Sequence, residues 1–225
     1  MQEMTHKILI TAGPTYERID PVRFIGNYSS GKMGIALAHQ CLQRGMEVEL
    51  VLGPVSIDLH TLEAAGPELL RVTHVESAAE MYEACISLYP QCDAAILCAA
   101  VADFTPITIA PQKIKREGEE LILRLKPTKD IAHELGKMKA PGQLLIGFAL
   151  ETNDEIHNAQ KKLERKNLDF IVLNSLRDSG AGFRHDTNKI TIISPQQTLH
   201  FPLKTKEECA ADIIGHLHQL LLKTC

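Results

Sequence analysis

The amino-acid sequence predicts an α/β protein built on a doubly wound, mostly parallel sheet. Short runs of apolar and β-branched residues alternate with longer segments whose apolar residues recur at helical spacing. Glycine, often followed by proline, marks the ends of these runs. Such strand–helix–strand alternation indicates parallel strands joined by right-handed crossovers. The 225 residues, 44% of them hydrophobic, suffice to bury the core of such a sheet.

The first half of the chain holds the clearest elements. The run KILITA at Lys7–Ala12 is typical of a buried parallel strand, because it is almost continuously apolar and ends at Gly-Pro. A helix is expected over Gly31–Arg44, because Gly45 is a favourable residue just after a helix end. Further elements are predicted as strands at Met46–Leu52, Leu70–Val75 and Asp93–Ala100 and a helix at Ala78–Leu88.

The alternation breaks at residues 104–127, where a basic run, KIKR (Lys113–Arg116), precedes the alternating segment Leu121–Lys126. This pattern predicts an extended arm with a β-hairpin that projects from the sheet. The α/β rhythm then resumes with expected helices at Thr128–Lys139, Asp154–Lys166 and Thr205–Leu222, strands at Leu144–Leu150 and Leu168–Leu173, and a C-terminal β-hairpin of Lys189–Ile193 with Thr198–Phe201. No linker or repeat divides the chain, so we expect one domain, residues 1–225, with a Rossmann-like sheet and the arm within it.

Composition narrows the function classes. A net charge of −4 and a pI of about 6.2 argue against a general affinity for nucleic acid or an anionic membrane. No apolar run approaches the ~20 residues that span a bilayer, and the N-terminus lacks a signal-peptide pattern, so we expect a cytoplasmic protein. The six cysteines form no C-x-x-C pair and the ten histidines are not spaced as ligands. We therefore expect free thiols and no metal held by the protein alone.

The stretch GNYSSGKMG at Gly26–Gly34 resembles a phosphate-binding P-loop, G-x-x-x-x-G-K-[ST]. Two observations argue against that interpretation. The last position is Met33, which lacks the hydroxyl that contacts Mg²⁺, and the preceding strand ends as far back as Ala12. A P-loop follows its strand directly, so we expect a different way of holding an anion.

The same stretch still predicts an anion site. Ser29 and Ser30 are expected to cap the following helix, while Gly31 and Gly34 leave the amides of its first turn open to close approach. A helix N-terminus with free N–H groups attracts phosphate. An ordinary capped helix explains a serine but not two glycines and a lysine.

Polar residues gather in the loops that follow the predicted strands, where ligands bind in open α/β sheets. They include Arg23, Asn27, Ser29, Lys32, Asp103 and Asn174. Two basic groups have competing interpretations. The run Lys113–Arg116 is either a solvated face or a part of the arm that neutralises phosphate. Lys162 and Lys166 lie one helical turn apart, and this spacing alone favours an ordinary solvent-exposed helix surface.

Two other functions suit the same fold. An NAD(P)-dependent oxidoreductase is one, with Glu49 as the acid that would bind a ribose, although the first connection, TAGPT, lacks the G-x-G-x-x-G fingerprint. The other is a non-catalytic nucleotide-binding protein. A pyrophosphate assay separates the latter from an enzyme that cleaves nucleotide.

Several motifs together resemble one family. ITAGPT, DPVR, SSGKMG, CAAVADF, KIK, GFALET and KNLDFIVLN, spread from Lys7 to Leu222, are similar to phosphopantothenoylcysteine synthetase, the second half of the bacterial bifunctional coenzyme A biosynthesis protein. The flavin-dependent decarboxylase half has no counterpart here, so the resemblance implies a stand-alone synthetase.

The resemblance implies a phosphopantothenate–cysteine ligase. Such an enzyme activates the carboxylate of 4′-phosphopantothenate with CTP or ATP, giving an acyl-nucleotide and pyrophosphate. L-cysteine then forms the amide and nucleoside monophosphate leaves. The resemblance also implies Mg²⁺ and a homodimer in which the arm of one subunit covers the site of the other. It implies no nucleic acid and no membrane partner.

It also assigns roles at matching positions. Asn27, Arg23 and Lys113 are the expected catalytic residues, with Asn27 at the acyl carbonyl. Asn27, Ala99 and Ala100 are expected at the phosphopantothenate site. The expected nucleotide-binding residues are Gly13, Ser29, Gly31, Gly34, Asp103, Lys113, Lys129, Asp130, Ile131, Ala132, Phe148, Lys162, Lys166 and Asn174. The bacterial pattern N-P-D-I-V reads TKDIA here (Thr128–Ala132), which leaves CTP and ATP both open, with CTP the expected nucleotide.

Overall fold

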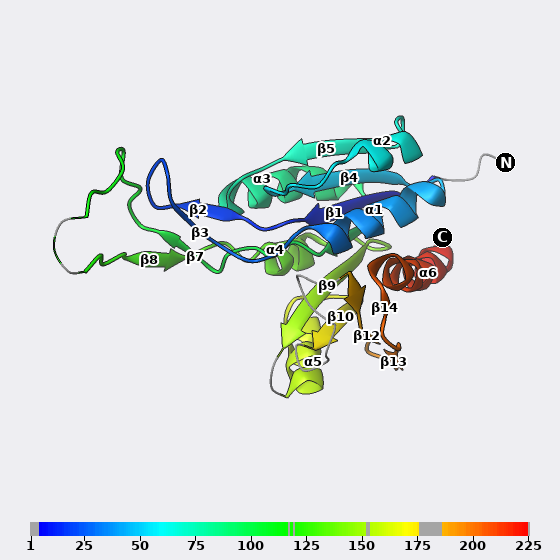
Figure 1. Ribbon diagram of the computed structural model, residues 1–225. Helices are drawn as coiled ribbons and strands as arrows, with labels where there is room; N and C mark the ends of the chain where they lie inside the picture. The colour runs from blue at the N-terminus through cyan, green and yellow to red at the C-terminus, as the bar shows by residue number, and fades with distance from the viewer. Residues whose placement is uncertain (1–4, 117, 119, 152–153, 176–185, 225) are drawn as a thin grey trace.

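An eight-stranded sheet forms the centre of the computed structural model, which describes residues 5–116, 118, 120–151, 154–175 and 186–224 (Figure 1). Six parallel strands are β5 (Leu70–His74), β4 (Glu47–Leu52), β1 (Lys7–Ala12), β6 (Ala94–Leu97), β9 (Leu144–Glu151) and β10 (Phe170–Ser175), in that spatial order. Two antiparallel strands, β12 (Ile190–Ile193) and β13 (Thr198–His200), extend the β10 edge. The predicted terminal hairpin is therefore part of the main sheet.

Helices cover both faces of the sheet. One core cluster packs α1 (Lys32–Gln43), α2 (His60–Ala65) and α6 (Lys206–Thr224) against one face, and the other packs α3 (Ala78–Leu88), α4 (Ile131–Met138) and α5 (Glu155–Arg165) against the opposite face. A short 3₁₀ turn, η1 (Tyr89–Gln91), follows α3. The central strand residues Ile8, Leu9 and Ile10 are fully buried, which explains why this strand is apolar on both faces. The doubly wound, mostly parallel sheet predicted from the sequence is confirmed.

The strand order places a switch point between β1 and β6. From β1 the chain moves outward through β4 to β5, and it then returns to the other side of β1 for β6, β9 and β10. The chain connections after β1 and β6 therefore continue in opposite directions across the sheet, and in open α/β sheets ligands bind at such a point, at the carboxyl edge. The fold itself thus determines where a ligand can bind.

Several boundaries differ from the predicted ones. Strand β6 ends at Leu97 and not at Ala100, because Ala99 N donates to the Thr11 Oγ1 hydroxyl (3.1 Å) and Ala100 bridges to Pro14 instead. Helix α4 begins at Ile131 and not at Thr128, because the Asp130 side chain caps it by accepting from His133 N (3.1 Å). Helix α2 and the two-residue strands β11 (Thr187–Asn188) and β14 (Lys204–Thr205) were not predicted, since such short elements carry little periodicity.

A small hairpin and the arm lie to one side of the sheet (Figure 1). The hairpin pairs β2 (Tyr16–Arg18) with β3 (Phe24–Gly26), and the Tyr16 and Phe24 rings stack at 3.7 Å. The base of the arm pairs β7 (Phe104–Pro106) with β8 (Leu125–Pro127). The alternating segment at Leu121–Lys126 therefore contributes a strand only at its end, and residues 117 and 119 lie outside the described structure.

The arm is tied to the turn of the β2–β3 hairpin. The Asp20 carboxylate accepts from Ile114 N (3.1 Å), and Arg23 donates both to that carboxylate and to the Ile114 carbonyl oxygen (2.8 Å). The hydrogen bond from Arg23 holds the pKa of Asp20 well below its usual value. Ala110 N adds a bond to Ile19 O (2.9 Å). These contacts fix the direction in which the arm leaves the sheet.

Candidate functional site

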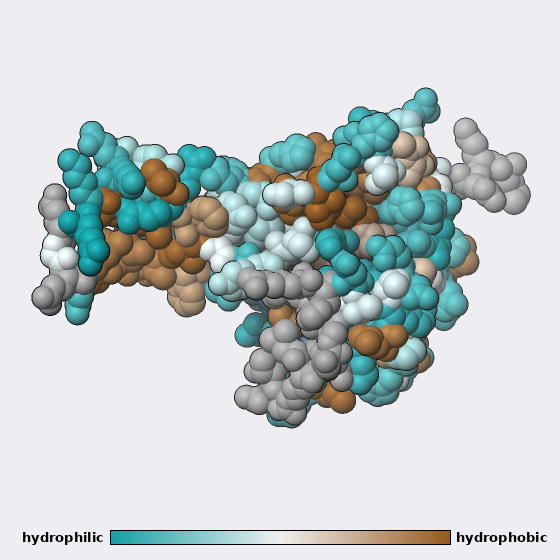
Figure 2. All heavy atoms as spheres, viewed as in Figure 1, coloured by the Kyte–Doolittle hydropathy of each residue, from teal (hydrophilic) through white to brown (hydrophobic). Residues whose placement is uncertain are grey.

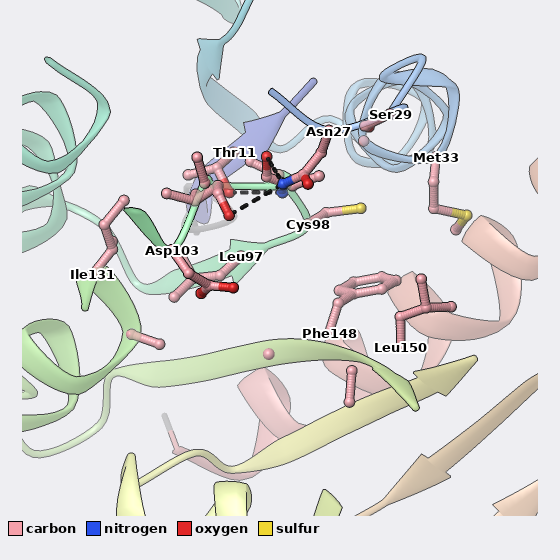
Figure 3. Close-up of a pocket in the computed structure, with 18 of the residues that line it drawn as sticks. Thr11, Asn27, Ser29, Met33, Leu97, Cys98, Asp103, Ile131, Phe148 and Leu150 are labelled. Carbon is pink, nitrogen blue, oxygen red and sulfur yellow. Dashed lines mark hydrogen bonds between the residues drawn. The ribbon is translucent and has the colours of Figure 1, made fainter. Parts of the chain in front are cut away.

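A pocket of about 850 Å³ lies at the carboxyl edge of the sheet (Figure 3). Its walls come from the ends of four strands: Thr11 from β1, Leu97 from β6, Phe148 from β9 and Asn174 from β10. The start of α1 closes one end. The volume suits a small organic ligand.

The N-cap residue of helix α1 is a glycine, not a serine. Gly31 is the N-cap residue and has φ +79°, a left-handed conformation that a residue with a side chain rarely adopts. The Ser29 hydroxyl accepts from Gly31 N (3.3 Å), and the N-cap residue Gly31 has no side chain with which to cap the helix. The predicted serine cap is therefore wrong. The residues of the first helical turn nevertheless line the pocket, and an anion site at a helix N-terminus uses the amides of that turn.

A second glycine allows α1 to lie against the sheet. A Cβ atom on Gly34 would stand 2.4 Å from the Ala12 Cβ, so no larger residue fits there without moving the helix. Gly13, which has φ +81°, lies directly behind Gly31 and does not itself line the pocket. These glycines bring the helix start close to the end of β1.

Asn27 joins the two loops at the switch point. Its Nδ2 donates to the Ala100 carbonyl oxygen (3.1 Å) and the Val101 carbonyl oxygen (3.3 Å), as the dashed lines in Figure 3 show. Ala100 N in turn donates to Gly13 O (2.9 Å). The loops after β1 and β6 therefore form one hydrogen-bonded unit, with Asn27 at the pocket side.

Acidic and basic side chains meet at the other end of the pocket. Lys166 Nζ lies 3.0 Å from Asp130 Oδ1, the same carboxylate that caps α4. Burial by itself would raise the pKa of Asp130. The hydrogen bonds from Lys166 and His133 N outweigh this effect, so the pKa of Asp130 is lowered overall. The ammonium of Lys129 pairs with Glu83 (3.1 Å). Its charge is thus compensated by α3.

Most of the predicted site residues lie around this one pocket. Those lining it are Asn27, Ser29, Gly31, Gly34, Ala99, Ala100, Asp103, Lys129, Asp130, Ile131, Ala132, Phe148, Lys162, Lys166 and Asn174. They come from separate parts of the chain, and the strand order brings them together.

Arg23 and Lys113 are not brought to this pocket within one chain. Both line a second cavity of about 900 Å³, whose other walls are arm residues such as Ile114 and Arg116. Arg23 is already bonded to Asp20 and to the arm backbone. Arg23 or Lys113 can therefore act on a ligand in the first pocket only if the arm moves or if a second copy of the chain supplies the residue.

Other lining residues were not predicted. Thr11, Cys98, Asn188 and Lys206 all contribute to the pocket wall. Asn188 is the last residue of the two-residue strand β11, and Lys206 is the first residue of α6. A single lysine at the start of an amphipathic helix gives no sequence signal. Burial raises the pKa of the Cys98 thiol to about 12, so this thiol is not a reactive nucleophile.

The structure describes every cysteine except Cys225. Cys41, Cys85, Cys92, Cys98 and Cys209 are free thiols. Among the residues that the structure describes, no group of three or more His, Cys, Asp or Glu side chains is placed to hold a metal ion. None of the described helices has the length and apolarity needed to cross a membrane.

This combination of a doubly wound sheet and a polar pocket at its switch point defines a class, the small-ligand-binding α/β proteins. Residues 4–221 match the family model for the DNA/pantothenate metabolism flavoprotein C-terminal domain. Because that match spans nearly the whole chain, the protein belongs to this family.

Individual relatives agree with this assignment. The chain is 45% identical over 218 residues to the coenzyme A biosynthesis bifunctional protein CoaBC of Bacillus subtilis (strain 168), covering 96% of this chain and 52% of that protein. It is 60% identical over 216 residues to a cysteine/cysteine sulfinic acid decarboxylase from an unknown prokaryotic organism, covering 96% of this chain and 58% of that one. The chain thus spans somewhat more than half the length of these curated relatives.

Solved structures match over the whole chain. The crystal structure of the C-terminal domain of CoaBC superposes with a TM-score of 0.80 at 39% identity, covering 97% of this chain and 96% of that one. A complex of a Cab2 mutant with phosphopantothenate-cysteine has a TM-score of 0.76 at 19% identity and covers 97% of this chain and 88% of its own. At that identity the second likeness shows the fold alone.

Proposed function

We propose that this chain is a phosphopantothenate–cysteine ligase of coenzyme A biosynthesis, acting in the cytoplasm. Two observations together carry the proposal: the likeness to the CoaBC C-terminal domain extends over nearly the whole chain, and most of the residues assigned from the family pattern line one pocket. The substrates are 4′-phosphopantothenate, L-cysteine and a nucleoside triphosphate, with CTP preferred over ATP.

Both half-reactions move negative charge, and the pocket offers groups that stabilise it. The first residues of α1 line the same pocket as Lys162 and Lys166, so backbone amides and ammonium groups can both reach a ligand there. Phosphate oxygens and the departing pyrophosphate or nucleoside monophosphate would be stabilised by these donors. A protein nucleophile is not needed, because the acyl-nucleotide is attacked by the cysteine amine of the substrate.

Asn27 is placed to orient the acyl group. Its NH₂ group donates to the Ala100 and Val101 carbonyl oxygens, so contact with an acyl oxygen requires that the amide share or exchange one of these bonds. The loop carbonyls therefore hold the side chain in position until the activated acyl group arrives. Such a hydrogen bond does not depend on pH across the neutral range, because a carboxamide does not titrate.

Mg²⁺ would enter together with the nucleotide. This ion binds through one or two carboxylates plus substrate phosphates and keeps several waters, so it needs no cluster of protein ligands. Asp103, an exposed carboxylate at the pocket wall, fits that requirement. When bound, Mg²⁺ neutralises phosphate charge.

A homodimer would explain the exposed apolar surface of the arm. Figure 2 shows hydrophobic side chains gathered over the projecting part of the molecule. Exposed fractions there reach 51% for Phe104, 55% for Ile109 and 81% for Ile122. Apolar patches of this kind mark interaction surfaces. In the dimer we propose, the arm of one subunit brings Lys113 over the pocket of the other.

The competing functions have weaker support. Glu49, the expected ribose-binding acid of an oxidoreductase, does not lie at a strand end: it is buried within β4 and pairs with Lys7 (2.7 Å) and Arg71 (3.8 Å). The decarboxylase name belongs to a longer relative, of which this chain spans 58%. A non-catalytic nucleotide-binding protein is distinguished from the ligase by turnover.

The test is pyrophosphate release from a nucleotide panel. Protein is mixed with phosphopantothenate, L-cysteine, Mg²⁺ and, in turn, CTP, ATP, UTP or GTP. We expect pyrophosphate and an equal amount of phosphopantothenoylcysteine, with CTP giving the highest kcat/KM. Binding of a nucleotide without any release would leave only the non-catalytic alternative.

A further inference from the structure

We propose that Lys206 is a further ligand-binding residue of the pocket and that its ammonium group binds a phosphate group of a substrate. This inference rests on the proposed function for the identity of the substrate. It concerns a residue that the family motifs did not single out.

Lys206 is unusual among the lysines of the described structure in its burial. Its side chain is 5% exposed although it contributes to the pocket wall. Lysines are almost never fully buried unless their charge is compensated. A buried ammonium group therefore has either a structural or a ligand-binding reason for its position. The place of Lys206 on the pocket wall favours ligand binding.

Two ammonium groups influence the same end of the pocket. Lys32 is the first residue of α1 and Lys206 is the first residue of α6, and both line the pocket. Helices α1 and α6 pack side by side in the core. The Asp186 carboxylate lies 2.5 Å from Lys32 Nζ, and its charge also acts on Lys206. Lys206 N also donates to Asp186 O (2.9 Å), so two cationic side chains lie at the same end of the pocket, and such an arrangement favours an anion there.

The surroundings of Lys206 agree with this preference. Burial lowers the pKa of Lys206, and the nearby charge of Lys32 lowers it further, so the protein without ligand places the ammonium at an electrostatic cost. The neighbouring lining residues Asn174 and Asn188 are neutral, and the Asn188 amide donates to Asn174 Oδ1 (3.1 Å). A bound phosphate at this end of the pocket would lower that cost, because its charge attracts the ammonium group.

Two substrates carry phosphate, and the test separates them. Inorganic tripolyphosphate represents the nucleotide chain, and its binding is measured by isothermal titration calorimetry, which needs no turnover. The KM values for nucleotide and for phosphopantothenate are then measured separately. The variants are Lys206→Met and Lys206→Gln, with Lys223→Met as the control, since Lys223 is an exposed lysine near the other end of α6.

We expect Lys206→Met to weaken tripolyphosphate binding by about 10- to 100-fold, the effect of losing one hydrogen bond to a charged group, and to raise the nucleotide KM in parallel. Lys223→Met should change neither. A rise confined to the KM for phosphopantothenate assigns Lys206 to that phosphate instead. Unchanged tripolyphosphate binding together with both KM values unchanged would overturn the proposal.

Lys206→Gln keeps a polar donor and serves as the second variant if Met disturbs folding, which thermal unfolding followed by circular dichroism detects. The proposed function can fail separately. One outcome is that the native protein releases no pyrophosphate while the Lys206 variants bind tripolyphosphate more weakly than the native protein does. In that case the ligase assignment is wrong and Lys206 remains a phosphate-binding residue.

Discussion

The carboxamide of Asn27 is hydrogen-bonded to the backbone carbonyl oxygen of Ala100, 3.1 Å away, across the switch point of the sheet. These residues are 73 positions apart in the sequence. The contact holds a polar side chain from the first loop against the loop that follows β6. Asn27→Asp would replace the donating NH₂ by a carboxylate oxygen that faces two carbonyl oxygens.

We therefore expect Asn27→Asp to lower kcat by about 10²- to 10³-fold, as the loss of an oriented polar contact typically does. The second half-reaction should be affected most, so the acyl-nucleotide should accumulate and be visible in quenched single-turnover samples. Gln219→Glu, the same amide-to-acid change on an exposed residue of α6, is the control. Full turnover by Asn27→Asp would remove Asn27 from its proposed role.

Lys166→Met should raise the KM for the nucleotide by about 10- to 100-fold, because a hydrogen bond to a charged group is lost. The ammonium of Lys166 is only partly exposed and lies at the pocket wall. Lys166 is the C-cap residue of α5. Lys161→Met removes an equal charge from an exposed position within that helix and should leave KM unchanged. Equal effects of the two substitutions would indicate a general charge effect instead of a contact.

The substitution Asp130→Asn removes the negative charge of residue 130 but keeps a side chain that can cap α4. Asparagine caps a helix about as well as aspartate, so the loss of stability should stay below about 1 kcal/mol, as expected for a partly exposed ion pair. The pKa of Asp130 is lowered in the folded protein, so its contribution is present above the unfolded pKa and is lost as pH falls through the folded pKa. Urea unfolding at several pH values should show the full difference at pH 7 and a progressively smaller one as the pH falls below the unfolded pKa of about 3.9. A difference that persists at low pH would contradict the assignment to the charged form.

Gly34→Ala tests the close approach of α1 to β1. The added Cβ would lie 2.4 Å from the Ala12 Cβ, so the helix start must move, at a cost of about 1–3 kcal/mol in unfolding free energy. The nucleotide KM should rise as well, because the first-turn amides shift. Gly215→Ala is a matched control in α6, where a Cβ meets nothing within 4 Å and helix propensity predicts a gain of up to about 1 kcal/mol. Thermal unfolding of both variants measures the contrast.

Ile122→Asp tests the arm as a dimer contact. Ile122 is 81% exposed in the single chain, and a carboxylate in a buried apolar interface would be strongly unfavourable. Sedimentation equilibrium should show a dimer for the native protein and a monomer for the variant, with at least a tenfold loss of activity. Leu222→Asp places the same charge on an exposed position of α6 and should leave the dimer intact. A monomeric native protein would rule out the proposed arrangement of the arm.

The sequence by itself determined the doubly wound sheet, because buried parallel strands must be apolar on both faces and amphipathic helices must cover them. It also indicated that polar residues follow the strand ends. Short elements such as β2 and α2 could not be predicted from the sequence, because three to six residues show too little periodicity. The cap of α1 was predicted wrongly, since a left-handed backbone at Gly31 competes with a serine cap only in the folded context.

Tertiary structure decided which of those polar residues share a pocket. It placed Asn27, Phe148 and Lys166 around one pocket, and it placed Arg23 with Lys113 at a second cavity beside the arm. It also brought Lys206, near the end of the chain, next to the start of α1. Local periodicity records which side of an element is buried. Which distant loops meet depends on strand order, and strand order is determined by packing across the whole sheet.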